Sequence, residues 1–472
     1  MKKFTAVLLA CLCALVSGTS ADDFGRFVIV DPPAISVFPD HDKAVSGVLP
    51  LKEFIDNGKT LFGTAFNILD GAGRPNSTGD SKPTNRRRPS AEFNRIAGPD
   101  ASACADCHNR PSQGGAGGFA ATTFVGAHFS DPPTLSIDLA RTNERNTITV
   151  FGSGAIEMIA REMSEDLRNS YKEAAIRAET QQIEVVLKLR TKGVDFGQIT
   201  VRPDGTYGTE SIDGVDPDLV VKPFGVKGVA VSLREFSNFA LNQHHGIQSE
   251  ERFGWTRTGT RDFDGDGVNN EFTIGQLSAL TLYQASLPLP IRAAYTTPSV
   301  EQLSKLGETR FHDIGCTRCH IPSLPLKSAW FLEPNPFNRP GSLVPRDVSG
   351  QIAMPFNFKT NSAYKKDSTG NTRIMAYTDL KRHTICDNED PYFCNEKIRQ
   401  DFVPTEKFLT AKLWDVGTAR MYGHQGKLTT VSEAIYHHSG EAKKEKKSYL
   451  ALPKEDQRSI VMFLKSLRVE SE

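Results

Sequence analysis

The sequence predicts a mostly α-helical fold with long loops and one small β-hairpin, and two observations support the helical class. Apolar residues recur at helical spacing in the segments 155–191, 232–243, 274–285, 299–314, 430–437 and 453–467. The 27 prolines suit long connections between helices. The segment 197–208 differs, because its residues alternate around an Asp-Gly turn and predict a small β-hairpin.

The length of 472 residues exceeds what one hydrophobic core usually accommodates, so two domains are expected. We place an N-terminal domain at 22–295 and a C-terminal domain at 296–472. Each then contains one copy of the pentapeptide Cys-x-x-Cys-His, which is the strongest motif in the chain.

Both pentapeptides follow a Gly-x-Thr-x-Phe pattern, but at different distances. Gly307 precedes Cys316 by 9 residues, whereas Gly58 precedes Cys104 by 46 residues. The first domain is therefore expected to carry a large insertion of about 37 residues. The part around 71–89 is rich in Gly, Pro, Asn and Arg, which predicts a long surface loop.

Cys-x-x-Cys-His is the attachment site of c-type haem, in which two thiols bond to the porphyrin vinyl groups and the imidazole binds iron. Half of a zinc knuckle or a thioredoxin-like redox pair are the alternatives. A zinc site would need a second pair nearby, but the copies lie 212 positions apart and neither has a βαβ context. We therefore predict two covalent haem c groups. The motif residues are Cys104, Cys107 and His108 in the first copy and Cys316, Cys319 and His320 in the second.

The first 21 residues have the pattern of a secretory signal peptide. Lys2 and Lys3 precede an apolar stretch at 5–16, and small residues at 19–21 form a cleavage site. No later stretch approaches the roughly 20 apolar residues that span a bilayer. We expect a soluble, exported protein that begins near Asp22, with no membrane span.

Cysteine use and charge agree with export and restrict the partners. Outside the signal peptide and the two motifs only Cys386 and Cys394 remain, and a disulfide between them is expected in an oxidising compartment, with two buried thiols as the alternative. The formal net charge of zero argues against a nucleic-acid partner. Basic runs at 86–88 and 443–447 are either a docking surface for an acidic redox partner or simply solvated.

The segment 262–270 has the layout of a calcium loop. Oxygen-bearing side chains occupy positions 1, 3, 5 and 9, and Gly267 stands at position 6. Position 12, where a bidentate glutamate is expected, is Thr273, so another carboxylate would have to complete the site. A simple Asp-Gly turn is the alternative. The candidate calcium ligands are Asp262, Asp264, Asp266 and Asn270.

Several longer motifs carry a family resemblance. They are FNRIAGPDASACADCHN at 93–109, KPFGVKGVAVSLREF at 222–236, DFDGDGVNNE at 262–271, YTDLKRH at 377–383, LWDVG at 413–417 and TVSEAIYHHSGEA at 430–442. By these residues the chain resembles the di-haem cytochrome c peroxidase superfamily, and most closely its di-haem oxidoreductase branch. The resemblance implies two cytochrome c-like haem domains, one haem being the working site and the other an electron relay.

For the C-terminal haem, the resemblance implies a sixth iron ligand from the helix that follows the LWDVG motif. His438 falls at that position. Relatives with a high-potential relay haem have Met there, so His438 implies a lower potential. His424 and Met421 are the alternative ligands, and ordinary packing is the alternative role for all three.

For the N-terminal haem, peroxide chemistry needs an open distal side and an acid-base group within hydrogen-bond reach. The candidates are His244, His245 and Glu157, with Glu162 on the same helix as Glu157. The alternatives are a loop imidazole bonded to backbone and a solvated glutamate. One of the three tryptophans is a candidate for a position between the haems. For Trp414 the preferred interpretation is a buried core residue.

These observations predict a periplasmic di-haem oxidoreductase that reduces hydrogen peroxide, or another small oxidant, at the N-terminal haem. Its electrons would come through the C-terminal haem from a small periplasmic cytochrome c or cupredoxin. One alternative is a di-haem electron carrier with both irons six-coordinate. The other alternative is a di-haem oxidase that modifies proteins or uses dioxygen, because some relatives oxidise proteins or cleave hydrocarbons with dioxygen. The spare histidines that keep the carrier hypothesis open are His128, His244, His245, His312 and His383.

Overall fold

The computed structural model describes residues 30–73, 101–118, 120–123, 143–263, 265–357 and 364–469. The predicted signal peptide, most of the predicted insertion, the basic run at 86–88, His128 and Asp264 lie outside these residues. Among the residues that are described, no helix is both long enough and apolar enough to cross a membrane.

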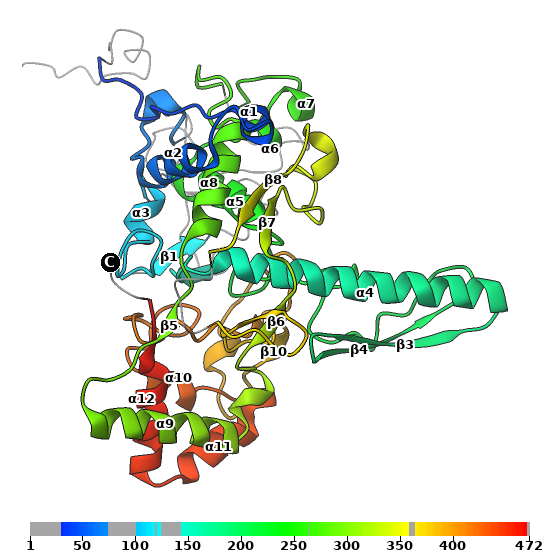
Figure 1. Cartoon of the computed structure of the whole chain (residues 1–472), viewed down its shortest axis with the longest axis vertical. Helices are drawn as coiled ribbons and strands as arrows, with labels where there is room; N and C mark the ends of the chain where they lie inside the picture. Colours follow the sequence, from blue (N-terminus) through cyan, green and yellow to red (C-terminus); the bar gives the residue numbers. More distant parts are fainter. Residues whose placement is uncertain are drawn as a thin grey trace, which may run out of the picture.

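The fold is mixed and modestly helical, with short paired strands in addition to the expected helices (Figure 1). The helices before the second motif are α1 (His41–Val45), α2 (Leu51–Gly63), α3 (Cys104–Cys107), α4 (Ser153–Gln181), α5 (Leu233–Ala240), α6 (Glu250–Phe253), α7 (Trp255–Thr258), α8 (Ile274–Ser286) and α9 (Pro298–Asp313). Those after it are α10 (Val431–Tyr436), α11 (Lys443–Ala451) and α12 (Lys454–Ser466). Short 3-10 turns and one π-helical turn connect them.

The strands form two-stranded antiparallel pairs, so the described strands do not assemble into a larger sheet. The pairs are β1 (Ala120–Thr123) with β2 (Asn143–Asn146), β3 (Val185–Thr191) with β4 (Val194–Val201), β5 (Ile291–Arg292) with β12 (Leu467–Arg468), β6 (Leu324–Leu326) with β9 (Thr372–Ile374), β7 (Trp330–Glu333) with β8 (Ile352–Pro355), and β10 (Arg382–Thr384) with β11 (Lys407–Leu409).

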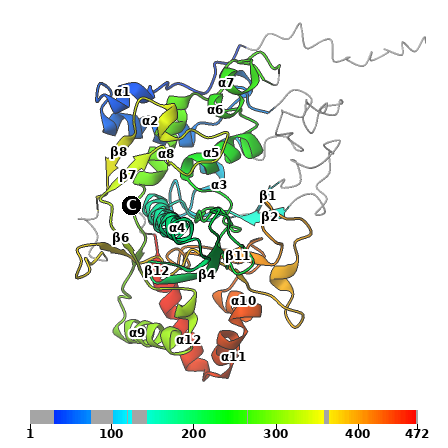
Figure 2. The ribbon, with the colours of Figure 1, turned by 90° about the vertical axis from the view of Figure 1, so that its right-hand side faces the viewer.

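The helix predicted at 155–191 ends ten residues early, and this part of the prediction was wrong. Helix α4 stops at Gln181, and Gln182 then adopts a left-handed conformation with φ 53°. The remaining residues form β3, which pairs with β4 in a hairpin. The predicted Asp-Gly turn lies at the end of this hairpin, where Val201 bridges to Tyr207. Together α4 and the hairpin form an arm that projects from the body (Figures 1 and 2).

The largest core surrounds α8, which is buried along its length. Helix α2 crosses α8 at Gly58, where a Cβ would lie only 2.0 Å from the carbonyl oxygen of Ala279. The base of α4 also packs against α8, and its predicted apolar stripe is fully buried at Ile156 and Ile159. The glycine of the first Gly-x-Thr-x-Phe pattern is thus required for helix contact.

A second core lies where α9 and α12 cross, in the lower part of Figure 1. Gly307 allows this crossing, because a Cβ there would lie 1.9 Å from the carbonyl oxygen of Ser459. The start of α9 is set by Thr297 and Pro298. Strands β6, β7 and β8 follow the second motif in sequence but pack into the first core. The two-domain division at 295 and 296 stays a prediction.

Candidate functional site

The second Cys-x-x-Cys-His motif forms a tight turn directly after α9. Cys316 opens a 3-10 turn, and the backbone N–H of His320 donates to the Cys316 carbonyl at 3.0 Å. Nδ1 of His320 lies 3.0 Å from the carbonyl oxygen of Tyr377. Because a carbonyl only accepts, Nδ1 carries the proton and the Nε2 lone pair is available to a metal.

His438 faces His320 across the space above this turn. The two imidazole centroids are 6.5 Å apart. Nδ1 of His438 donates to the Ala434 carbonyl at 2.6 Å, so its Nε2 also presents a lone pair. A metal–imidazole bond is about 2 Å long, and two rings that bind one ion from opposite sides have centroids roughly 6 Å apart. The spacing fits an iron between His320 and His438.

Both imidazoles are neutral, which is the form that binds metal. Burial lowers the pKa of His320 to about 4, and the proximity of His438 adds to this effect. Burial also lowers the pKa of His438. Neither ring therefore needs to lose a proton before it can coordinate an iron.

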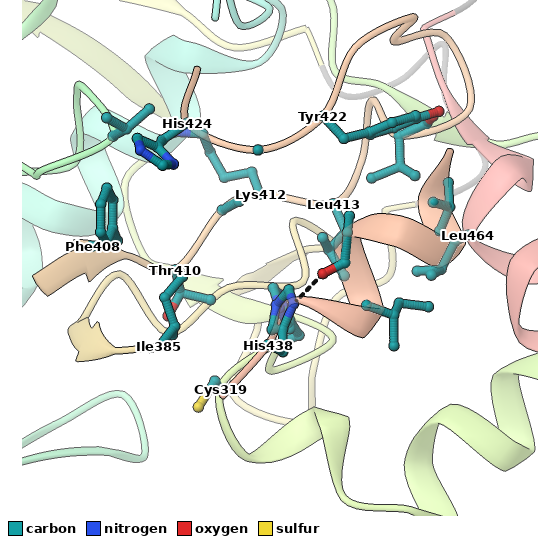
Figure 3. Close-up of a pocket in the computed structure, with 18 of the residues that line it drawn as sticks. Cys319, Ile385, Phe408, Thr410, Lys412, Leu413, Tyr422, His424, His438 and Leu464 are labelled. Atoms are coloured by element: carbon teal, nitrogen blue, oxygen red, sulfur yellow. Dashed lines mark hydrogen bonds between the residues drawn. The ribbon is translucent and has the colours of Figure 1, made fainter. Parts of the chain in front are cut away.

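Both histidines line a cavity of about 310 Å³. Figure 3 shows part of its lining, including His438. Its walls are mainly apolar, which suits a flat porphyrin. Figure 3 shows Cys319 and His424 toward opposite ends, with His438 and Lys412 between them. The apolar lining includes Phe311, Phe393, Phe408, Leu413, Val416, Val431, Tyr449 and Leu464.

The alternative ligands His424 and Met421 line the same cavity, and the ring contacts of His424 are with Tyr392, Phe393 and Phe408. Nε2 of His424 lies 2.9 Å from Oδ1 of Asn395, and its ring packs 4.8 Å from that of Phe408. Burial, together with the charges of Arg145, Lys227 and Lys427, lowers the pKa of His424 to about 3. The geometry favours His438 as the sixth ligand.

The first Cys-x-x-Cys-His motif has the same local construction. Its cysteines lie in the single turn α3, and the His108 N–H donates to the Cys104 carbonyl at 3.0 Å. Nδ1 of His108 lies 3.3 Å from the Gly115 carbonyl oxygen. Burial lowers the pKa of His108 to about 4. This imidazole is therefore also neutral and oriented by the backbone.

A π-helical turn, η4 (Leu241–His245), carries the two candidate histidines to the first motif. Nε2 of His245 lies 3.7 Å from Sγ of Cys104, and its Nδ1 lies 2.8 Å from the Ala101 carbonyl oxygen. His244 is close enough to His108 to lower its pKa further. Such turns occur frequently at functional sites. The structure thus brings both predicted histidines to the N-terminal motif.

Glu157 and Glu162 form hydrogen bonds or ion pairs with other parts of the fold. The alternative that Glu157 is a solvated glutamate was wrong. Glu157 is fully buried and accepts hydrogen bonds from the Leu233 N–H at 2.8 Å and from Asn335 at 2.9 Å. Burial and the nearby Glu333 raise its pKa to about 8. Glu162 pairs with Lys192. Both oxygens of Glu157 are thus occupied in joining α4 to α5 and to the loop after β7.

The candidate calcium loop folds around Asp262. Its carboxylate accepts the N–H groups of Gly265 at 2.7 Å and Gly267 at 3.1 Å, and Asp266 forms an Asx turn with the N–H of Val268 at 2.7 Å. Thr273 at position 12 is the N-cap of α8, where its hydroxyl accepts from Gln276 N–H at 3.3 Å. The hydroxyl of Thr273 is thus used to start a helix, and calcium binding stays a prediction.

Beside the C-terminal motif, the structure groups Cys319 and His383 with Asp379, a residue that sequence reasoning did not single out. Within the described residues, Cys319, Asp379 and His383 form a group whose ligand atoms lie within 4.8 Å of one another. Despite burial, hydrogen bonds to Asp379, Cys319 and Glu441 raise the pKa of His383 to about 11. The motif assigns Cys319 to haem, so we interpret this group as support for the turn. Lys412, beside the LWDVG motif, was also missed.

The two motifs share a wall. The loop after His108 is joined to residues 147–150 by bonds from Gly117 N–H to Thr147 and from Val150 N–H to Gly114, at 3.1 and 2.8 Å. Thr147 also lines the cavity of the C-terminal site. Trp414 lines that cavity too and packs so closely on Gly152 that a Cβ there would lie 2.5 Å from its ring. The prediction that Trp414 is a buried core residue is confirmed.

The predicted disulfide between Cys386 and Cys394 is confirmed. Ile385 and Phe393, next to the two cysteines, both line the cavity. The Phe393 ring lies 6.0 Å from that of His438. The disulfide therefore fixes one wall beside the candidate ligand.

Comparison with known proteins supports the resemblance inferred from the motifs. Residues 359–467 match the family described as "Di-haem oxidoreductase, putative peroxidase". This segment contains His383, the LWDVG motif and His438. The match confirms the family suggested by the sequence over this part of the chain.

The other comparisons add little. No curated protein matches the chain. Among solved structures, Kuenenia stuttgartiensis hydrazine synthase pressurised with 20 bar xenon is similar at 16% sequence identity and a TM-score of 0.24. The similarity covers 45% of this chain and 61% of that chain, so the chain spans less than two thirds of that protein. A likeness at this TM-score carries no argument.

Proposed function

We propose that the protein is a periplasmic di-haem c oxidoreductase that reduces hydrogen peroxide at its N-terminal site and receives electrons through its C-terminal site. The family match supports a di-haem redox enzyme. The observation that carries the finer assignment is the contrast between the two motif histidines. The ring of His320 has a second imidazole at 6.5 Å, whereas the N-terminal motif has the π-helical turn with two histidines beside Cys104 and His108.

Six motif residues and His438 hold the cofactors in this proposal. Each cysteine pair would hold a porphyrin through thioether bonds, and His108 and His320 would be the iron ligands. When bound, haem iron supplies one-electron transfer and, where a coordination position is open, a site for a small oxidant. The chain sets ligand orientation through the carbonyls of Gly115, Tyr377 and Ala434.

His245 is the acid-base group in the proposed reaction. The Ala101 carbonyl holds its proton on Nδ1, so Nε2 can accept a proton from peroxide and return it to the leaving oxygen. Reduction of one peroxide to two waters consumes two protons and two electrons. His244 lies on the same turn and completes the polar distal side. Glu157 takes no part, because Leu233 and Asn335 occupy its carboxylate.

Electrons pass from the C-terminal to the N-terminal site across the shared wall in this proposal. Trp414 and the loop at 147–150 are the parts of this wall that border the C-terminal cavity. The donor would be a small periplasmic cytochrome c or cupredoxin. Calcium at 262–270 would be an additional structural ion.

One experiment separates this proposal from a simple electron carrier. Mass spectrometry first establishes whether two haem groups are attached. Optical and EPR spectra are then recorded in the resting and half-reduced states, before and after addition of hydrogen peroxide. We expect one low-spin bis-imidazole signal that hydrogen peroxide does not change directly. We expect the signal of the other site to change, because that site reacts with peroxide. Two low-spin signals that are inert to peroxide in both states would exclude the enzyme.

A further inference from the structure

Lys412 is one of the charged side chains that line the mainly apolar C-terminal cavity. It lies near the centre of the C-terminal cavity, between His424 and His438 (Figure 3). Its ammonium group donates to the Pro223 carbonyl at 3.3 Å, which uses one of its three donors. Burial alone lowers its pKa to about 8, with no carboxylate acting on it among the described residues. A buried ammonium without a counter-charge is costly, so the site is incomplete.

Trp414 provides a second, independent observation at the same wall. Its side chain is only 2% exposed and borders the cavity. The indole N–H has no hydrogen-bond partner among the described residues. Most buried indoles do find an acceptor, because an unsatisfied donor costs about 1–3 kcal/mol. Lys412 and Trp414 are two residues apart, and both supply donors where an acceptor is missing.

The chemistry of haem identifies an acceptor of the right kind. The two vinyl groups that bond to cysteine lie on one edge of the porphyrin, and its two propionates lie on the opposite edge. Cys319 and Lys412 are separated across the cavity, with His438 between them (Figure 3). A porphyrin attached at Cys316 and Cys319 would therefore direct its carboxylates away from the cysteines and toward the side of Lys412.

We propose that Lys412 and Trp414 form the anchor for a propionate of the C-terminal haem, the ammonium as counter-ion and the indole N–H as hydrogen-bond donor. This inference rests on the proposed function, because it assumes that haem occupies the cavity. A charge-assisted bond of this kind would supply an acceptor to the Trp414 indole and a counter-charge to the Lys412 ammonium. It also positions a positive charge beside the cofactor, which favours the reduced iron.

Asp415 and Glu445 also line the cavity but do not replace the propionate. No ion pair joins either of them to Lys412 within the described residues, and Glu445 pairs with Arg318 at 2.9 Å. Burial raises the pKa of Asp415 to about 7, so this group is only partly charged near neutral pH. The cation therefore needs a carboxylate that the described residues do not provide.

The test compares Lys412→Gln, Lys412→Arg and Trp414→Phe in the full-length haem-loaded protein. Lys444→Gln is the matched control, because Lys444 is exposed and lies outside the cavity. Haem content is measured by pyridine haemochrome assay, the two reduction potentials by spectroelectrochemistry and the propionate bending bands by resonance Raman spectroscopy. Lys412→Gln should lower the potential of the C-terminal haem only, and Lys412→Arg should restore it. Lys412→Gln and Trp414→Phe should each shift one propionate band.

Two results would overturn the inference. One is a C-terminal potential and propionate bands in Lys412→Gln that equal those of Lys444→Gln. The other is loss of the C-terminal haem from both Lys412 variants with unchanged bands in Trp414→Phe, since that pattern indicates a packing role. Wild-type protein with no attached haem would instead refute the proposed function itself. The two failures are thus distinguishable.

Discussion

The two Cys-x-x-Cys-His sites are alike on the side of the motif histidine and different on the opposite side. In each, a glycine allows a close helix crossing, at Gly58 and at Gly307. In each, a phenylalanine four residues later packs 6.2 Å from the motif histidine, Phe62 on His108 and Phe311 on His320. One construction therefore serves both sites.

The opposite sides diverge in backbone as well as in side chains. At the C-terminal site, the end of α10 delivers one imidazole, and a disulfide stiffens the neighbouring wall. At the N-terminal site, a π-helical turn delivers two imidazoles, and the described wall beside it has no disulfide. The two sites thus differ in the residues that lie on the side opposite the motif histidine. The following predictions test this comparison.

Replacement of His438 with Ala should have the largest effect. Loss of the second imidazole should convert one low-spin haem to high spin and leave the other haem unchanged. EPR and visible spectra measure this conversion. His312→Ala is the control, because His312 is exposed on α9. An unaltered low-spin signal in His438→Ala would remove this residue as a ligand and end the contrast between the sites.

Replacement of His245 with Ala should slow peroxide reduction by about 100- to 10,000-fold, the range for loss of a general acid-base group. The C-terminal low-spin spectrum should stay the same, since His245 lies beside the N-terminal motif, near Cys104 and Ala101. Steady-state and rapid-mixing kinetics provide the measurement. A rate equal to that of His312→Ala would show that the acid-base group lies elsewhere.

Removal of the disulfide with Cys386→Ser and Cys394→Ser should lower the free energy of unfolding by roughly 2–3 kcal/mol, as expected for a short closed loop. Because Phe393 packs near His438, the C-terminal spectrum should also broaden. Denaturant unfolding and EPR line widths measure the two effects. Broadening of the N-terminal signal instead would contradict the inference that the disulfide stiffens the wall of the C-terminal cavity.

Replacement of Gly58 or Gly307 with Ala should cost about 1–3 kcal/mol through overpacking, by similar amounts at the two sites. The new Cβ would meet a backbone oxygen at 2.0 or 1.9 Å. Gly63→Ala on α2 is the control, because the atom nearest to a Cβ there is the flexible Nε2 of Gln113 at 3.6 Å. Thermal unfolding measures the loss. A large effect at only one glycine would show that the shared construction is superficial.

Helix positions were predictable where one periodicity dominated. The segments at 274–285, 299–314 and 453–467 coincide with α8, α9 and α12 to within a few residues. The end of α4 was not predictable by that rule, since apolar residues at 185, 187 and 189 continue the pattern while alternating as in a strand.

The site itself was predictable where the motif specifies the chemistry and not where distant contacts decide. The family position of His438 agrees with its place opposite His320. The burial of Glu157 depends on Asn335, 178 residues away, so the local sequence gave no sign of it. Lys412 carries no motif, and only the shape of the cavity reveals it.

The projecting arm has a practical consequence. Helix α4 begins beside Trp414 at Gly152 and runs for 29 residues, so its far end lies roughly 40 Å away along the helix axis. The tip at 181–184 is exposed on every residue. A fluorophore, an affinity tag or a tether to an electrode surface placed at this tip would be held clear of both cofactor sites. The tip of the arm is thus a suitable attachment point for single-molecule or electrochemical experiments.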